Sequence, residues 1–168
     1  SVATLTEAIG ITAPSFYTAF GSKGAFFKET LRRYSTTVIP LDRFLVPGAS
    51  PRNALSDMLT AAALVYAAHP RRRGCLILEH AKAATTEWGI AAMQIAGDNR
   101  NRVATFLKEC GVSTPERIAD YVAVTMLGLS AAAREGWDEA RLTAVAQTSA
   151  AGLAQLIGHD APQSNTSS

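Results

Sequence analysis

The chain has 168 residues, of which 48% are apolar, and its 16 Lys and Arg side chains exceed its 14 Asp and Glu side chains by two. Apolar side chains in this proportion can fill a core, which excludes a disordered chain or a coiled coil. The longest apolar runs stop well short of membrane-spanning length, and no signal peptide or lipidation motif is visible. We therefore predict a cytoplasmic protein without a membrane partner.

The composition also argues against a disulfide or metal scaffold. Cys75 and Cys110 are too few for a disulfide framework, which fits a reducing compartment. Together with three scattered histidines, these cysteines lack the spacing of metal ligands. We expect no metal and no other cofactor.

Helices are predicted throughout the chain. It contains 31 alanines, the residue with the highest helix propensity, whereas β-branched and aromatic clusters bounded by turns are scarce. We therefore predict an all-α fold. The first 20 residues are expected to form two short helices separated by Gly10-Ile11-Thr12, because glycine can end one helix and threonine can cap the next. The first of these helices runs from about Val2 to Ile9.

A longer third helix is predicted to begin after Ser22, its expected N-cap, and to extend to about Leu45 with a kink at Pro40. Apolar side chains recur along it every three or four positions, at Phe27, Leu31, Tyr34, Val38 and Leu41. Five more helices are expected over residues 51–68, 75–86, 87–110, 116–134 and 138–157.

The last two predicted helices are apolar on more than one face. A helix with two apolar faces needs two partners, so we expect this pair to pack on its own subunit and on a second copy. Small residues would let the two backbones approach closely. Burial of the whole pair inside a monomer is the alternative. The residues expected at the interface between copies are Val124, Leu127, Gly128, Ala131, Val145, Ser149, Gly152, Leu153 and Leu156.

The opening residues satisfy the requirements of a helix-turn-helix. Such a unit needs a tight turn, apolar residues that lock its two helices, and polar groups on the face of the second helix that enters the major groove. The pattern Val2-x-x-Leu5-x-x-x-Ile9-Gly10-Ile11-Thr12-x-x-Ser15-Phe16-Tyr17-x-x-Phe20-x-Ser22-Lys23-x-x-Phe26 supplies all three. It resembles the tetracycline-repressor (TetR/AcrR) family of transcriptional regulators.

This resemblance implies roles for individual residues. Thr12 would cap the recognition helix near a phosphate, Tyr17 would contact the DNA backbone, and Lys23 would add a phosphate contact at the next helix N-terminus. The positions that would face base edges are Ala13, Pro14, Ser15 and Thr18. Because the first two have no side-chain donor, direct reading of base edges should be sparse.

The resemblance also implies a domain organisation. Residues 1–45 would be a DNA-binding domain that lacks the family's first helix, and that helix would cover Leu5, Ile9, Phe16 and Phe20. Residues 46–160 would bind a ligand and dimerise, and residues 161–168 would form a polar tail. The implied function is a ligand-responsive repressor that binds double-stranded operator DNA as a homodimer.

An effector cavity is expected between the helices of residues 51–68, 87–110 and 116–134. Its apolar lining favours a small lipophilic ligand, with His80 as a polar anchor. The residues expected to line it are Met58, Ala62, Tyr66, His80, Trp88, Met93, Phe106, Tyr121 and Thr125.

One alternative function remains open on the sequence alone. The chain could be a helical small-molecule-binding or enzymatic dimer that uses Cys75 and His80 and has no affinity for DNA. Catalysis is disfavoured because no paired nucleophile and base, phosphate loop or metal cluster emerges from the spacing of residues. We therefore predict that the protein is not an enzyme.

Overall fold

The computed structural model describes residues 1–82 and 85–159, so the predicted polar tail lies outside the described residues. Every regular element in the described part is a helix, which confirms the all-α prediction. In chain order the elements are α1 (Val2–Ile9), α2 (Ala13–Phe20), α3 (Lys23–Thr37), the 3-10 helix η1 (Leu41–Arg43), α4 (Pro51–Ala67), α5 (Leu76–Ala81), α6 (Glu87–Glu109), α7 (Pro115–Arg134) and α8 (Glu139–His159).

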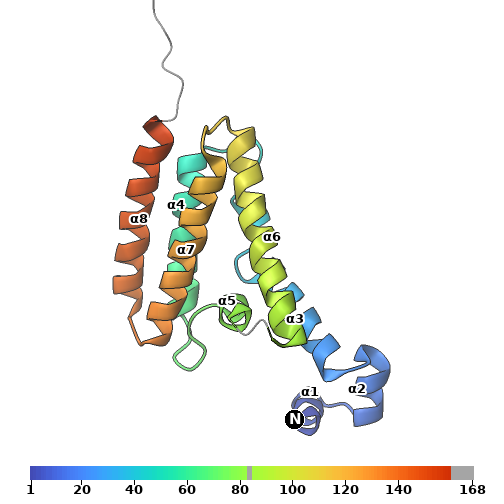
Figure 1. Cartoon of the computed structure of the whole chain (residues 1–168). Helices are drawn as coiled ribbons and strands as arrows, with labels where there is room; N and C mark the ends of the chain where they lie inside the picture. The colour runs from blue at the N-terminus through green and yellow to red at the C-terminus, as the bar shows by residue number, and fades with distance from the viewer. Residues whose placement is uncertain (83–84, 160–168) are drawn as a thin grey trace, which may run out of the picture.

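The helices form a bundle with a small pair projecting from one end. Figure 1 shows α4, α7 and α8 side by side, with α6 slanting across the other side of α7 and the short α5 near the lower end of the bundle. Helices α1 and α2 lie beyond that end and connect to the bundle through α3. One helix therefore joins the N-terminal pair to the rest of the molecule.

The prediction that the third helix reaches Leu45 is wrong. Helix α3 ends at Thr37, with Val38 as its C-cap. Proline has no backbone N–H and disfavours helical conformation in the residue before it, so Pro40 ends this helix instead of kinking it. The chain then turns through η1, which places Leu41 in the core.

Helix α5 is also shorter than the predicted range of 75–86 and ends at Ala81. Thr86 belongs to the following helix, because its backbone is extended and its hydroxyl accepts a hydrogen bond from the backbone N–H of Gly89. It is the N-cap of α6, so it cannot continue α5.

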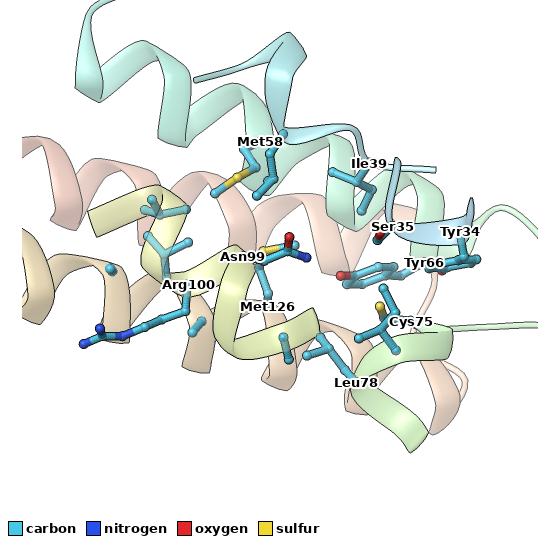
Figure 2. Close-up of a pocket in the computed structure, with 17 residues that line it drawn as sticks. Tyr34, Ser35, Ile39, Met58, Tyr66, Cys75, Leu78, Asn99, Arg100 and Met126 are labelled. Atoms are coloured by element: carbon cyan, nitrogen blue, oxygen red, sulfur yellow. The ribbon is translucent and has the colours of Figure 1, made fainter. Parts of the chain in front are cut away.

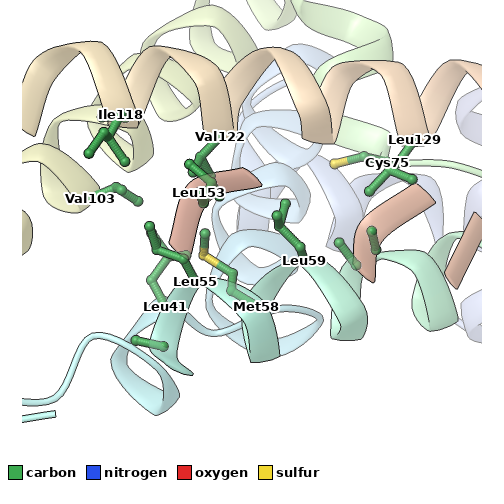
Figure 3. Close-up of a cluster of buried hydrophobic side chains, with 14 of the residues drawn as sticks. Leu41, Leu55, Met58, Leu59, Cys75, Val103, Ile118, Val122, Leu129 and Leu153 are labelled. Carbon is green, nitrogen blue, oxygen red and sulfur yellow. The ribbon is translucent and has the colours of Figure 1, made fainter. Parts of the chain in front are cut away.

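Helix α4 lies at the centre of the core. Its buried side chains recur at the spacing of one helical face, which continues from Leu55 through Leu59 to Tyr66. Helices α7 and α8 cover this face, and Figure 3 shows Val122 and Leu153 converging on it. Leu153 is 1% exposed in this core, so placing it at an interface between copies was wrong.

Candidate nucleic-acid interface and ligand cavity

A tight turn joins α1 to α2. Gly10 has φ +71°, the left-handed conformation that glycine adopts most readily, and the Ile11 backbone N–H donates to the Thr6 carbonyl at 3.1 Å. Thr12 then caps α2 by accepting a hydrogen bond from the Ser15 backbone N–H. These contacts confirm the helix–turn–helix read from Gly10-Ile11-Thr12.

Aromatic rings lock α2 onto α3. Phe16 is 0% exposed, and its ring centroid lies 5.2 Å from that of Phe20 and 5.3 Å from that of Phe26. The Tyr17 ring meets Phe16 edge to face at 5.6 Å. Phe16 is therefore buried by α2 and α3 themselves, whereas Ile9 is 48% exposed.

The side of α2 away from this cluster is free of other parts of the chain. The residues predicted to meet DNA from this side are all exposed, and we call them the α2 face: Thr12, Ala13, Pro14, Ser15, Tyr17 and Thr18. The hydroxyls of Thr12 and Ser15 lie 2.9 Å apart, and the Thr18 hydroxyl donates to the Pro14 carbonyl at 3.0 Å. While its hydroxyl donates to the Pro14 carbonyl, the Thr18 side chain offers a DNA base an acceptor and a methyl group, but no free donor.

Positive potential accompanies the α2 face. Neither α2 nor α3 has an acidic residue of its own in its first turn, so the partial positive charge of the α2 N-terminus is not offset within its helix. At the α3 N-terminus, the Glu87 carboxylate of α6 approaches Gly24. Lys23 is the first residue of α3 and is exposed, next to the Ser22 cap that accepts from the Ala25 N–H at 3.0 Å. This arrangement suits a phosphate group.

The first half of α3 packs against α5 and α6. The Lys28 Nζ lies 2.5 Å from the Glu87 Oε1 on α6. The Phe27 ring packs edge to face on His80 of α5, with ring centroids 4.9 Å apart, and on Trp88 of α6 at 6.2 Å. The position of α5 and α6 therefore constrains the helix that carries the α2 face.

The second half of α3 borders a cavity of about 120 Å³ inside the bundle. Figure 2 shows side chains from α3, α4, α5, α6 and α7 around it. The lining residues are Tyr34, Ser35, Ile39, Leu41, Met58, Tyr66, Cys75, Ile77, Leu78, Ala96, Asn99, Arg100, Val103, Ala119, Val122, Ala123 and Met126. The N-terminal pair and the cavity thus share one helix.

Only two residues of the predicted lining, Met58 and Tyr66, border this cavity. Ala62 lies on the same buried face of α4 but packs in solid core, and Phe106 is buried near the opposite end of α6. His80 was predicted as the polar anchor, but its ring packs on Phe27 instead of lining the cavity.

The other predicted lining residues lie on different surfaces. Trp88 packs with His80 against Phe27. Met93 is 49% exposed on α6. Tyr121 is also exposed, and Thr125, one turn further along α7, donates its hydroxyl to the Tyr121 carbonyl at 2.8 Å. Helical spacing located apolar faces correctly, but it could not show which face would border a void.

Two phenols and a thiol gather at one end of the cavity. Figure 2 shows Tyr34, Tyr66 and Cys75 together, with Arg100 at the opposite end. The Cys75 thiol is close enough to both phenols to interact with them, and the Leu76 backbone N–H interacts with the Tyr34 phenol. Cys75 is fixed by its own backbone N–H, which donates to the Ser130 hydroxyl at 2.8 Å. His80, the other residue that the alternative function without DNA binding would use, is absent from this group.

This environment makes both phenols hard to ionise. Burial, together with the nearby Cys75, raises the pKa of Tyr34 from 10.0 to about 12. Burial also raises the pKa of Tyr66 well above its ordinary value. The cavity end therefore holds neutral hydrogen-bond donors at physiological pH.

These pKa shifts predict an alkaline loss of stability. Because the pKa of Tyr34 is higher in the folded chain than in the unfolded chain, its contribution is complete below pH 10 and is lost as pH rises toward 12. We expect the urea midpoint to fall over this interval. The fall should be shallower in Tyr34→Phe, and an identical slope in both proteins would contradict this account.

Exposed apolar side chains also gather on the outer side of α7 and α8. Val124 is 68% exposed, Leu127 is 41% exposed and Val145 is 40% exposed. Added methyl groups at Gly128 and Gly152 would meet no other atom within 4 Å. We call this surface the α7–α8 face; it comprises Tyr121, Val124, Leu127, Gly128, Ala131, Val145, Ser149, Gly152 and Leu156.

Residues 1–82 and 85–159 lack two further features. No helix of this part is long and apolar enough to cross a bilayer. No group of three or more His, Cys, Asp or Glu side chains in the same residues could hold a metal ion.

Known proteins share both the sequence and the fold of this chain, although no family model matches it. The HTH-type transcriptional repressor BdcR of Escherichia coli is 31% identical over 147 residues, which cover 87% of this chain and 75% of BdcR. A cysteine mutant of CifR, a TetR family transcriptional regulator solved with 26-base-pair double-strand operator DNA, is 26% identical with a TM-score of 0.71. That match covers 90% of this chain and 85% of the CifR chain.

A TetR transcriptional regulator from Rhodococcus sp. RHA1 is 28% identical with a TM-score of 0.62, over 91% of this chain and 87% of that chain. Each of these three matches covers between 87% and 91% of this chain. The chain therefore belongs to the TetR family of helix-turn-helix transcriptional regulators.

Proposed function

We propose that this protein represses transcription by binding double-stranded operator DNA as a homodimer, and that a small lipophilic effector in the bundle cavity controls the binding. The observation that carries the proposal is the position of α3. This helix begins at Lys23, directly after the α2 face, and its residues Tyr34 and Ser35 line the cavity. The role is regulatory and not catalytic.

The α2 face supports the DNA-binding part of the proposal. It is exposed, it carries mostly short side chains that let the helix approach base edges, and it includes the N-terminus of α2, which has no acidic residue in its first turn. Residues 1–45 hold five basic and three acidic side chains, a modest excess of positive charge. Thr12, Tyr17 and Lys23 would contact the phosphate backbone, and Ser15 and Thr18 would contact bases.

The α7–α8 face supports a homodimer. A contiguous apolar surface of this kind on a water-soluble bundle marks a contact surface. The α7–α8 faces of two copies of the chain can pair about a two-fold axis. This symmetry matches the two half-sites of an operator. Helix-turn-helix dimers place their recognition helices about 34 Å apart, one turn of DNA.

Control by an effector would act through the tilt of α3. Tyr34 lies eleven residues beyond Lys23, or about 16 Å along the helix. A tilt of about 5° about Tyr34 would therefore move Lys23 by roughly 1.4 Å. A ligand that binds one tilt more tightly than the other shifts the spacing of the two α2 faces, and operator affinity changes with it.

The proposed function is tested by titrating salt against binding of the protein to DNA from upstream of its own gene. We expect a steep fall in affinity with salt, because phosphate contacts release counterions, and a preference for one site over random DNA. Binding that shows neither salt dependence nor site preference would contradict the proposal.

Lys23→Ala should weaken binding to all DNA sequences about equally. The salt slope should decrease by about 1 for each phosphate contact removed, and thus by about 2 per dimer. The matched control is Lys108→Ala, which removes an exposed lysine near the far end of α6 and should leave the slope unchanged. A changed footprint in Lys23→Ala would contradict the phosphate role.

Ser15→Ala should instead change the sequence preference at one position of each half-site. The Thr12 cap on the Ser15 backbone N–H persists in this variant, so the helix start is preserved. A binding-site selection experiment measures the preference, and uniform weakening across all sequences would reassign Ser15 to the DNA backbone.

A further inference from the structure

The chemistry of the cavity restricts which effector it can take, and this step rests on the proposed function because it concerns the same site. We infer that the effector is a compact, uncharged molecule no larger than about one six-membered ring, with one oxygen acceptor, such as a small ketone, held at the Tyr34–Tyr66–Cys75 end. Size, charge and hydrogen-bonding capacity each support this inference.

The size limit follows from the cavity volume of about 120 Å³. An apolar protein cavity of about 150 Å³ holds one benzene molecule. Most of the lining is aliphatic, with Met58 and Met126 on opposite helices, so the body of the ligand should be apolar. Sterols, fatty acids and nucleotides are too large for this space.

The charge limit follows from the state of Arg100, the sole charged residue among the described residues of the lining. Its Nε donates to the Asp120 Oδ1 at 2.7 Å, and its Nη2 donates to the Glu116 carbonyl. The same pairing lowers the pKa of Asp120 and keeps this carboxylate charged. With its guanidinium already neutralised, the cavity offers no free countercharge to an anion or a cation.

The hydrogen-bonding limit follows from a count of donors. The phenols of Tyr34 and Tyr66 and the thiol of Cys75 bring three hydrogens to donate, whereas their acceptors are two phenol oxygens and a weakly accepting sulfur. The Leu76 backbone N–H also competes for the Tyr34 oxygen, and the Ser35 hydroxyl donates away from the cavity to the Arg32 carbonyl at 2.7 Å. A ligand oxygen would give a phenol O–H a stronger acceptor than sulfur.

Two molecules of nearly equal shape test this inference on the full chain. Cyclohexanone has the oxygen acceptor, and methylenecyclohexane replaces it with a CH₂ group. We expect cyclohexanone to bind about fivefold to tenfold more tightly, the difference made by one neutral hydrogen bond. The anion cyclopentanecarboxylate should bind far more weakly than either.

The three methionines report binding at the correct place. In a protein labelled with ¹³C at the methionine methyl groups, saturation with cyclohexanone should shift the Met58 and Met126 resonances, which belong to the lining. The Met93 resonance should stay constant, because its side chain is exposed on α6 and outside the cavity. Titration of these shifts gives the dissociation constants.

Tyr66→Phe supplies the matched variant, since it removes one hydroxyl and keeps the ring that shapes the cavity. It should lower cyclohexanone affinity to the level of methylenecyclohexane, and Tyr34→Phe should reduce it in the same direction. Equal affinities of the two probes for the unmodified protein would overturn the inference, as would tight binding of the carboxylate or shifts confined to Met93.

The operator-binding assay separates this inference from the proposed function. If salt-dependent operator binding is present but neither neutral probe shifts Met58 or Met126, the ligand class is wrong and the DNA-binding function stands. If cyclohexanone binds as expected but leaves operator affinity unchanged at saturation, the ligand class stands and control through α3 is wrong.

Discussion

Phe16→Ala is expected to abolish operator binding while leaving the helical bundle folded. Phe16 is fully buried, and the rings of Tyr17, Phe20 and Phe26 surround it. Truncating a buried phenylalanine costs about 3–5 kcal/mol. Among the described residues, the N-terminal pair has no other fully buried large side chain. We therefore expect this loss of free energy to be enough to unfold the pair.

The expected loss of operator affinity is at least about 100-fold, because a destabilisation of roughly 3 kcal/mol depopulates the binding-competent state by that factor. Fluorescence anisotropy with labelled operator measures the loss at constant salt. Leu64→Ala is the control, since Leu64 is an exposed apolar residue on α4 outside the pair. Operator affinity within twofold of the unmodified protein in Phe16→Ala would contradict the role assigned to this ring cluster.

The helical bundle and its cavity are expected to stay intact in Phe16→Ala. The bundle core contains none of the residues around Phe16, so its thermal unfolding and the shifts of Met58 and Met126 on adding cyclohexanone should persist. Circular dichroism should show the loss of about the helical content of α1 and α2. Collapse of the entire helical signal would show that the pair and the bundle fold as one cooperative unit.

Leu127→Asp is expected to convert the proposed homodimer into monomers. Leu127 is 41% exposed in the centre of the α7–α8 face, between Val124 and Gly128. In a dimer, a carboxylate at this position would be buried against the same carboxylate of the second copy, without a countercharge. Sedimentation velocity should show a protein of 17.7 kDa per particle in place of twice this mass.

Loss of the dimer should lower affinity for a two-half-site operator by about 100-fold or more, because the second α2 face no longer binds intramolecularly. Met93→Asp is the matched control: it adds the same charge at an exposed apolar position, 49% exposed on α6, away from α7 and α8. Val145→Asp on α8 should reproduce the effect of Leu127→Asp. A dimer that persists in both variants would place the contact surface elsewhere.

Local sequence determined the helical pair and the positions of its functional residues. Gly10 allows the left-handed turn, and Thr12 caps the next helix. Phe16 is buried on one side of this helix, whereas its neighbours in sequence are exposed. These effects act between residues a few positions apart, so they can be read from the order of residues alone. The exposed positions of the α7–α8 face followed from the same periodicity, apart from Leu153.

Tertiary structure alone decided where the cavity lies. A periodic pattern shows that Ala62, Phe106 and Tyr66 occupy buried faces, but a void exists only where side chains of several helices fail to fill the space between them. Tyr34 and Ser35 of α3 lie at the cavity wall, and Cys75 meets the two phenols across 41 and 9 residues of sequence. The order of residues fixed which faces are apolar; packing among five helices fixed which of those faces a ligand can reach.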